Sequence, residues 1–247
     1  MAPSPAPSAA PSPAPSAAPS SSGSAIPAEA RQLIVATVDD WDDISAELQR
    51  YARAGGGAWR AIGDPWPAVI GAHGSAWGRG LHGDGAPAGR GGPTKREGDG
   101  KSPAGAFSLG GSYGYAARSP GGARTPYVQV DPSWVCVDDA RSSHYNRVLD
   151  ADGVEVDWSS KEDMRRRDEL YRWVVFVDHN QDATAGAGSC IFLHVWRSSD
   201  SGTAGCTAME RGSIEALLAW LDPAAHPTFV LLPAGERDAL RAAWRLP

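Results

Sequence analysis

The segment Gly188–Arg211, GSCIFLHVWRSSDSGTAGCTAMER, combines a strand pattern with two reactive side chains. Its stretch Cys190–Trp196 is largely apolar and predicts a buried strand that carries His194 near its end. A loop of small and polar residues follows, and Cys206 comes directly after the last glycine of that loop. The segment therefore predicts a strand and a loop that present a histidine and a cysteine together.

Cys206 and His194 are the residue types needed for attack of a thiolate on a carbonyl carbon. A free thiol has a pKa of about 8.5, so only a few per cent is ionised at neutral pH. A neighbouring imidazole can take the thiol proton and later protonate a leaving amine. Gly205 leaves the approach to the thiol open and lets backbone N–H groups converge on an oxyanion. From these residues alone, a structural histidine and an inert cysteine are the more common interpretation of such a pattern.

The remainder of the chain predicts a mainly β domain with a few helices, extending over residues 25–247. The long stretch Gly78–Pro103 is rich in glycine and polar residues, and a loop of that length usually serves a site. Predicted strands are Gln32–Val38, Ala58–Ile62, Pro67–His73, Tyr127–Val130, Trp134–Val137, Trp173–Val177 and Phe229–Leu232.

Three segments predict helices. In Trp41–Ala54 an aspartate pair precedes the segment and can cap it, and Ile44, Leu48 and Tyr51 share one helical face. Ser213–Leu221 places leucines and an isoleucine at i, i+3, i+4 and i+7, and the last predicted helix is Ala234–Trp244.

Composition excludes several classes of protein. The 247 residues carry a formal charge of −6, which argues against a nucleic-acid partner. No apolar run is long enough for an ordinary transmembrane helix, so no stable membrane insertion is expected. Residues 1–24 are almost entirely Ala, Pro and Ser without charge, which predicts a disordered spacer. An expression or gene-start artefact would give the same pattern, and no secretory signal pattern is visible.

The three cysteines are too few for a disulfide scaffold. Cys136 and Cys190 each lie in a predicted apolar strand. They can form a disulfide in an oxidising compartment, or remain two separate buried thiols. Either pairing leaves Cys206 as the odd cysteine, which is consistent with a reactive thiol.

The segment around His194 and Cys206 resembles the active-site signature of the YkuD-type L,D-transpeptidases. That signature is a histidine, a spacer of around a dozen residues and then [Ser/Thr]-x-Gly-Cys. Here the last part is Thr203-Ala204-Gly205-Cys206, and eleven residues lie between His194 and Cys206. The resemblance covers roughly residues 59–233. Further blocks that resemble the family are Leu81–Leu109, Ser142–Arg147 and Tyr171–Asn180.

The resemblance implies a largely β fold with a β-sandwich-like core and the cysteine in a cleft. It implies attack on the meso-diaminopimelate–D-Ala amide of a peptidoglycan tetrapeptide, loss of D-Ala, and transfer of the acyl group to an amine or to water. In this scheme Cys206 is the nucleophile and His194 is the general base and acid. The N–H groups of Gly205 and Cys206 hold the oxyanion. Thr203 orients the imidazole or the loop. The implied partner is the peptidoglycan stem peptide, without metal or organic cofactor, in an extracytoplasmic location.

Two positions depart from the family pattern. Many members carry His or Arg two residues before the cysteine and Arg or Asn two residues after it, whereas this chain has Ala204 and Ala208. The group that orients His194 is therefore left open, and a backbone carbonyl is one candidate.

Six further residues are candidates for substrate binding. Lys101 and Arg96 lie in the glycine-rich loop, where cations can meet the carboxylates of a stem peptide or simply form a solvated turn. Tyr145 and Asn146 lie in a polar segment that can line the cleft or form a β-turn. Trp196 and Arg197 directly follow the strand that carries His194.

Two other functions compete with the transpeptidase hypothesis. A wall-associated domain could bind peptidoglycan in the same cleft with little turnover. A metal-dependent peptidase could use His73, His82 and Asp84, but these residues lack the spacing typical of zinc sites.

Overall fold

The computed structural model describes residues 24–122 and 124–247, so the predicted spacer lies outside the described residues except for its last residue. That residue, Ser24, donates a hydrogen bond from its hydroxyl to the Trp244 carbonyl at 2.7 Å. Ser24 is therefore attached to the folded part of the chain, one residue before the predicted domain boundary.

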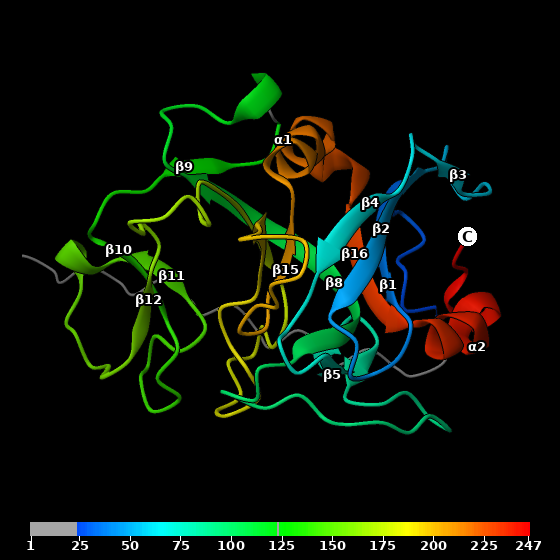
Figure 1. The fold of residues 1–247 in the computed structure, drawn as a ribbon, viewed down its shortest axis with the longest axis horizontal. Coiled ribbons are helices and arrows are strands. Elements are labelled where there is room, and N and C mark those ends of the chain that lie inside the picture. Colours follow the sequence, from blue (N-terminus) through cyan, green and yellow to red (C-terminus); the bar gives the residue numbers. More distant parts are fainter. Residues whose placement is uncertain (1–23, 123) are drawn as a thin grey trace, which may run out of the picture.

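The fold is mainly β, and its strands close into a hydrogen-bonded ring (Figure 1). This closed barrel differs from the β-sandwich-like core that we expected, because the last strand of the path pairs with the first. In ring order the strands are β1 (Gln32–Val38), β16 (Thr228–Pro233), β8 (Ser102–Gly114), β13 (Trp173–Val177), β14 (Phe192–Val195), β15 (Thr207–Met209), β4 (Trp66–Val69) and β2 (Ser45–Ala52), which pairs back with β1.

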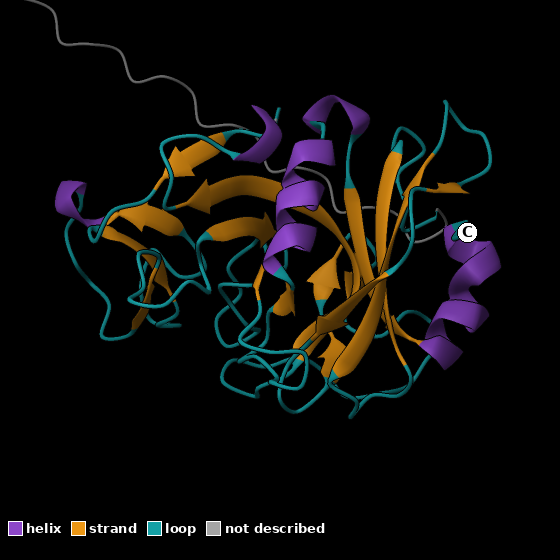
Figure 2. Ribbon diagram, turned by 45° about the horizontal axis from the view of Figure 1, so that its top comes forward, coloured by secondary structure: helices purple, strands orange, loops and turns teal. Residues whose placement is uncertain are grey.

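Shorter elements decorate this barrel. Two α-helices of the described chain lie on its outside (Figure 2). They are α1 (Arg211–Trp220) and α2 (Ala234–Trp244), and the short 3-10 helices are Pro120–Gly122, Ala151–Gly153 and Pro223–Ala225. The additional strands are β3 (Arg60–Ala61) beside β2, β5 (Ser75–Trp77) and β9 (Tyr127–Gln129) beside β8, and the pair β6 (Arg79–Gly80) and β7 (Gly83–Asp84).

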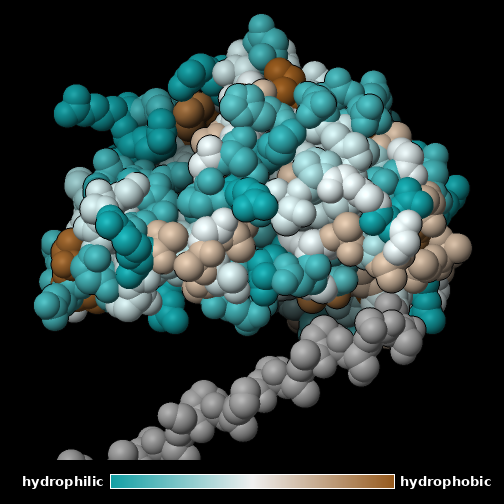
Figure 3. All heavy atoms as spheres, turned by 90° about the horizontal axis from the view of Figure 1, so that it is seen from below, coloured by the Kyte–Doolittle hydropathy of each residue, from teal (hydrophilic) through white to brown (hydrophobic). Residues whose placement is uncertain are grey.

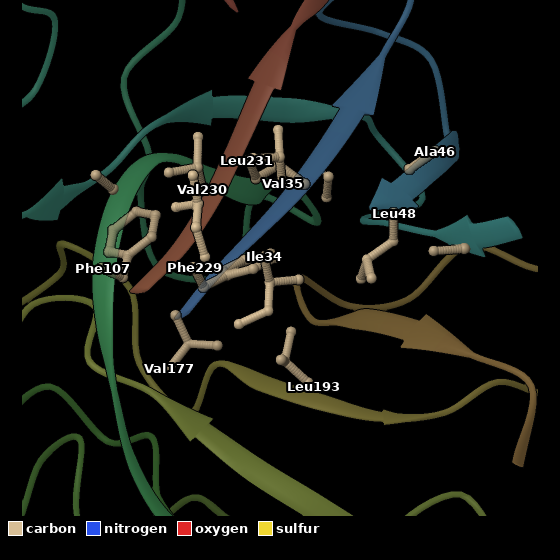
Figure 4. Close-up of a cluster of buried hydrophobic side chains, with 14 of the residues drawn as sticks. Ile34, Val35, Ala46, Leu48, Phe107, Val177, Leu193, Phe229, Val230 and Leu231 are labelled. Atoms are coloured by element: carbon tan, nitrogen blue, oxygen red, sulfur yellow. The ribbon is translucent and has the colours of Figure 1, made fainter. Parts of the chain in front are cut away.

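The barrel interior is filled by alternate side chains of its strands. On β14, Leu193 and Val195 belong to the main core, whereas Phe192 belongs to a second cluster on the other face. Val177 and Leu193 point toward Ile34 of the opposite wall in Figure 4. The same alternation directs the side chain of His194 away from the barrel interior.

A small sheet stands beside this outer face. It consists of β11 (Val148–Asp150), β10 (Trp134–Val137) and β12 (Lys161–Asp163), and it lies apart from the barrel strands in Figure 1. A disulfide joins Cys136 of β10 to Cys190, just before β14. Of the two possibilities left open by the sequence, the structure therefore shows the disulfide, which ties the small sheet to the barrel.

The predicted helix over Trp41–Ala54 is wrong, because residues 45–52 form strand β2. Ala46 and Leu48 are buried, while Ser45 and Glu47, which alternate with them, are exposed, a period of two rather than 3.6. β2 is hydrogen-bonded on one side to β1 and on the other to β4, and these pairings override the local helix pattern.

The longest strand, β8, was not predicted. Its segment is rich in small residues, and these permit close packing that a sequence pattern does not reveal. Gly105 has φ +140°, and a Cβ atom at this position would lie 2.0 Å from the His82 ring. The predicted loop Gly78–Pro103 also contains the short strands β6 and β7 and ends inside β8.

The other predicted elements are confirmed, with shifts at their ends. Gln32–Val38, Trp134–Val137, Trp173–Val177 and the helix Ala234–Trp244 have the predicted bounds. The strands predicted over Ala58–Ile62, Pro67–His73, Tyr127–Val130, Cys190–Trp196 and Phe229–Leu232 correspond to β3, β4, β9, β14 and β16, and the helix predicted over Ser213–Leu221 is α1.

The face shown in Figure 3 is mostly hydrophilic, with hydrophobic residues only in small separate patches. Among the described residues, no helix combines the length and the apolar character that crossing a bilayer requires.

Candidate active site

His194 and Cys206 are brought together by the neighbouring parallel strands β14 and β15. The register pairs Leu193 with Thr207 and His194 with Ala208. Because side chains alternate along a strand, Cys206, directly before β15, points to the same outer face as His194. Both residues line one cavity of about 450 Å³ between the barrel and the small sheet.

The His194 imidazole is held by a backbone carbonyl. Its Nδ1 lies 2.8 Å from the Val195 oxygen, and because a carbonyl only accepts, Nδ1 carries the proton. The Nε2 atom is therefore the ring nitrogen with a free lone pair. Burial lowers the pKa of His194 to about 4, so the ring is neutral near neutral pH and can accept a proton. Val195 thus fills the orienting role that the sequence left open.

The Cys206 thiol is buried, at 5% exposure. Its Sγ donates a weak hydrogen bond to the Cys190 carbonyl at 3.6 Å. Burial is the main cause that raises the pKa of Cys206, and the negative charge of Glu162 raises it further. The Phe192 N–H and the positive charge of Lys95 act in the opposite direction and favour the thiolate.

The turn before Cys206 is fixed by two hydroxyl groups. Thr203 Oγ1 donates to the Cys206 carbonyl at 2.6 Å and accepts from the Gly205 N–H at 3.1 Å. Ser102 Oγ, on β8, lies 2.7 Å from the Gly205 carbonyl and 3.0 Å from the Cys206 carbonyl, and it accepts from the Gly71 N–H at 2.9 Å. Thr203 therefore orients the loop rather than the imidazole.

Gly205 departs from its expected role in one respect. Its N–H, expected to hold an oxyanion, already donates to Thr203. The need for glycine is steric, since a Cβ atom here would lie 3.1 Å from the Lys101 carbonyl oxygen. Gly205 therefore allows the loop to pack closely against the chain that leads into β8.

Of the six residues predicted to bind substrate, Trp196 and Arg197 line the cavity. Lys101 and Arg96 are not among its lining residues. The ammonium group of Lys101 instead bonds to the Asp42 carboxylate at 3.1 Å and to the His73 carbonyl, while Arg96 is exposed.

Tyr145 and Asn146 are buried and also lie outside the lining of the cavity. The Tyr145 hydroxyl donates to Glu97, which does line it. The Asn146 side chain donates to the carbonyls of His179 (2.8 Å) and Asn180 (2.9 Å) and accepts from the Cys190 N–H at 2.9 Å. Both residues thus support the cavity wall from behind.

Three lining residues were not singled out from the sequence, namely Glu162, Arg166 and Tyr171. Tyr171 packs edge-to-face on His194, with ring centroids 5.2 Å apart, and its hydroxyl donates to Glu162. Only Tyr171 had a signal, because it begins a block that resembles the family. Lys95, a further cation of the predicted glycine-rich loop, also lines the cavity and bonds to the Asp99 carboxylate at 2.5 Å.

In residues 24–122 and 124–247, no three His, Cys, Asp or Glu side chains are arranged to hold a metal ion. Comparison of the chain with protein-family models, curated proteins and solved structures finds no match. The functional conclusion therefore rests on the geometry of the cavity and on the sequence resemblance.

Proposed function

We propose that this protein is a cysteine L,D-transpeptidase that acts on peptidoglycan stem tetrapeptides. The observation that carries the proposal is the shared cavity of Cys206 and His194, in which Nδ1 of the imidazole donates to the Val195 carbonyl. This arrangement leaves Nε2 free to act as the base for a thiol on the same face.

In the proposed reaction, His194 accepts the thiol proton as Sγ attacks the carbonyl carbon of the meso-diaminopimelate–D-Ala amide. Collapse of the tetrahedral intermediate breaks the amide C–N bond, and the imidazolium returns the proton to the departing D-Ala nitrogen. An amine of a second stem peptide or a water molecule then attacks the thioester, which regenerates the thiol. The Cys206 N–H is the proposed oxyanion donor, and Gly205 can join it only by releasing Thr203.

The proposed location is extracytoplasmic, as the substrate requires. The Cys136–Cys190 disulfide is compatible with this location, because such bridges persist mainly in oxidising compartments.

The test is incubation with purified disaccharide-tetrapeptide, followed by mass spectrometry of the products. Wild-type protein should release D-Ala, and Cys206→Ser should release none while it keeps the same fold, since an alcohol ionises far less readily than a thiol. A carbapenem should also add its mass to the wild-type protein and not to Cys206→Ser.

Turnover that persists in Cys206→Ser would contradict the proposal. A carbapenem adduct without any D-Ala release would instead identify a binding protein with little turnover. The D-Ala release assay is also run with and without a chelator. Only a metal-dependent peptidase should lose activity when the chelator is present.

A further inference from the structure

Three carboxylates line the cavity that holds the proposed nucleophile and base. Two of them belong to the small sheet, where the register places Glu162 of β12 opposite Cys136 of β10. Because side chains alternate along a strand, Asp138, two residues after Cys136, lies on the same face as Glu162. The disulfide from Cys136 joins this face to the barrel. The small sheet therefore turns Asp138 and Glu162 toward the strands that carry the reacting groups.

Glu97, the third carboxylate, is fixed on the barrel side of the disulfide. Its Oε2 accepts hydrogen bonds from Ser189 Oγ at 2.7 Å and from the Tyr145 hydroxyl. Ser189 directly precedes Cys190, where the disulfide reaches the barrel, and both residues line the cavity. The three carboxylates thus face the cavity from both sides of the disulfide.

Asp138 has a buried carboxylate oxygen, Oδ1, without a hydrogen-bond partner among the described residues. Glu97 and Glu162 are held through Oε2, Glu162 by the Tyr171 hydroxyl. Burial of a carboxylate oxygen without a partner lowers stability, because the oxygen loses its hydration. The three side chains therefore have more acceptor capacity than the chain itself uses.

The ion pairs around the cavity do not include these carboxylates. Lys95 is bonded to Asp99 at 2.5 Å, and Arg166 to Asp168 at 2.9 Å. Arg197, the other cation that lines the cavity, is exposed, so solvent and salt weaken its field. Within residues 24–122 and 124–247, the three carboxylates are thus left without an ion-pair partner.

The effect of this charge is visible at Glu162. Burial is the main cause that raises its pKa, the charges of Asp138 and Glu97 raise it further, and the Tyr171 hydroxyl and Arg166 lower it. A cation inside the cavity would therefore be attracted by all three carboxylates. A primary ammonium group fits such a set of acceptors, because it has three N–H donors and no acceptor of its own.

We propose that Glu97, Asp138 and Glu162 form a specificity-determining subsite of the cavity that binds an alkylammonium group of the substrate. The inference rests on the proposed function, in which the side chain of meso-diaminopimelate carries such a group. The subsite selects a stem peptide with a free amine, since a neutral side chain would leave the carboxylate oxygens without donors. The ammonium belongs either to the peptide that acylates Cys206 or to the peptide that receives the acyl group.

The test compares the rates at which two methanethiosulfonates modify Cys206, the free cysteine, without any peptidoglycan. The thiolate attacks the reagent sulfur, a mixed disulfide forms and methanesulfinate leaves. The aminoethyl reagent is cationic and the hydroxyethyl reagent is neutral and similar in size, so the ratio of their rates cancels changes in thiol ionisation. Asp138→Asn and Glu162→Gln should each lower this ratio about threefold, the effect of one unit charge at about 7 Å in a medium as polar as water.

The matched control is Asp200→Asn, which removes an exposed carboxylate from the loop that precedes Cys206 but outside the lining of the cavity. It should keep the wild-type ratio, and so should Asp138→Glu, which keeps the charge. Asp138→Asn should also unfold at a urea concentration no lower than that of the wild type, because Oδ1 has no hydrogen bond to lose. A purely structural role of Asp138 would instead lower that concentration.

Purified tetrapeptide then identifies the peptide whose ammonium is bound. A higher KM for D-Ala release in Asp138→Asn assigns the subsite to the peptide that acylates the thiol. Unchanged D-Ala release with more hydrolysis and less cross-linked product assigns it to the acceptor.

The proposal is overturned if Asp138→Asn and Glu162→Gln keep the wild-type ratio, or if Asp200→Asn lowers it equally. A Cys206 thiol that neither reagent modifies would also contradict it, because an ammonium group could then not reach the carboxylates beside the thiol. Circular dichroism checks the fold of each variant, and either cavity variant decides the outcome if the other does not fold. Because these reactions need no peptidoglycan, they remain readable if D-Ala release, the test of the proposed function, fails.

Discussion

His194 shows how burial keeps a single imidazole neutral and at the same time makes the stability of the fold sensitive to acid. The imidazole is surrounded by protein, with one nitrogen satisfied by the Val195 carbonyl. The buried ring is neutral and keeps a lone pair for a proton, but protonating it in place is costly because the charge would lose its hydration. The same property that suits the ring to the proposed reaction therefore predicts an effect of pH on stability.

The stability of the protein should fall as the pH falls from about 6.5 to about 4. The pKa of His194 is lowered from 6.5 to about 4 in the fold, and that of His179 likewise. In this window the unfolded chain binds more protons than the folded one, so acid favours unfolding. Urea titrations at pH 7, 5.5 and 4.5 should show a weaker pH dependence for His194→Gln than for the wild type.

The control for this measurement is His226→Asn, at an exposed residue with φ +48°, a conformation that asparagine tolerates. It should keep the wild-type pH dependence. A His194→Gln protein whose unfolding free energy changes with pH as steeply as that of the wild type would show that His194 does not titrate as described.

At the scale of single residues, the sequence predicted those site residues that lie close together in the chain. His194, Thr203, Gly205 and Cys206 stand close together in the chain, and all four line the cavity. Glu162 was not foreseen, because it reaches the site from a distant strand. Nothing in its immediate neighbours marks a glutamate that becomes half-buried against a tyrosine.

The loop that connects β14 to β15 is held in place by a third strand, β8. Ser102 of β8 is fully buried and bonds to backbone groups on both sides of it, at Gly71, Gly205 and Cys206. Its hydroxyl replaces the backbone pairing that an irregular loop cannot make for itself. Thus the loop that carries the proposed nucleophile is anchored to a barrel strand far away in the sequence.

Replacing Ser102 with alanine should lower the free energy of unfolding by about 1–3 kcal/mol, because buried backbone groups lose their partner. It should also slow carbapenem acylation of Cys206, since the loop is no longer held in place. Urea denaturation and intact-protein mass spectrometry measure the two effects. The control is Ser198→Ala, which removes an exposed hydroxyl bonded to Asp200 and should change neither the free energy of unfolding nor the acylation rate. Equal losses of stability and acylation rate in both variants would refute the anchoring role of Ser102.

Among the elements, prediction succeeded where one pattern was dominant and failed where two patterns competed. β13 is apolar throughout and β1 is apolar except for Gln32 and Thr37, and both have the predicted bounds. In β2, Ile44, Leu48 and Tyr51 satisfy a helical spacing, while Ala46 and Leu48 satisfy a strand spacing. Pairing with β1 and β4 decides between them, and the local sequence contains no information about those partners.

For the whole molecule, the decisive arrangement is a barrel with its proposed site on the outside. The inner face of the ring holds the main core, while the outer face of β13 and β14 is covered by a second cluster. The small sheet completes the cavity wall over that outer face. The disulfide is the covalent link between the two parts, so it should support both the fold and the shape of the cavity.

Loss of this disulfide should destabilise the protein by about 4 kcal/mol, as expected for a bridge that closes a loop of 54 residues. The double variant Cys136→Ser, Cys190→Ser compared with the wild type in urea, without reductant, measures the effect. Adding reductant should destabilise the wild type and leave the double variant unchanged. If the wild-type protein unfolds at the same urea concentration with and without reductant, the bridge contributes little to stability.

The strands β8 and β13 are neighbours in the ring, yet residues 115–172 separate them in the chain. This one excursion supplies Glu162, Arg166 and Tyr171 to the cavity, while the thiol and the imidazole come from the ring itself. Under the proposed function, the reacting groups and much of the cavity wall around them are thus encoded in separate stretches. The excursion can therefore change in length or charge, and so alter the shape and charge of the cavity, without disturbing the hydrogen bonds that close the ring.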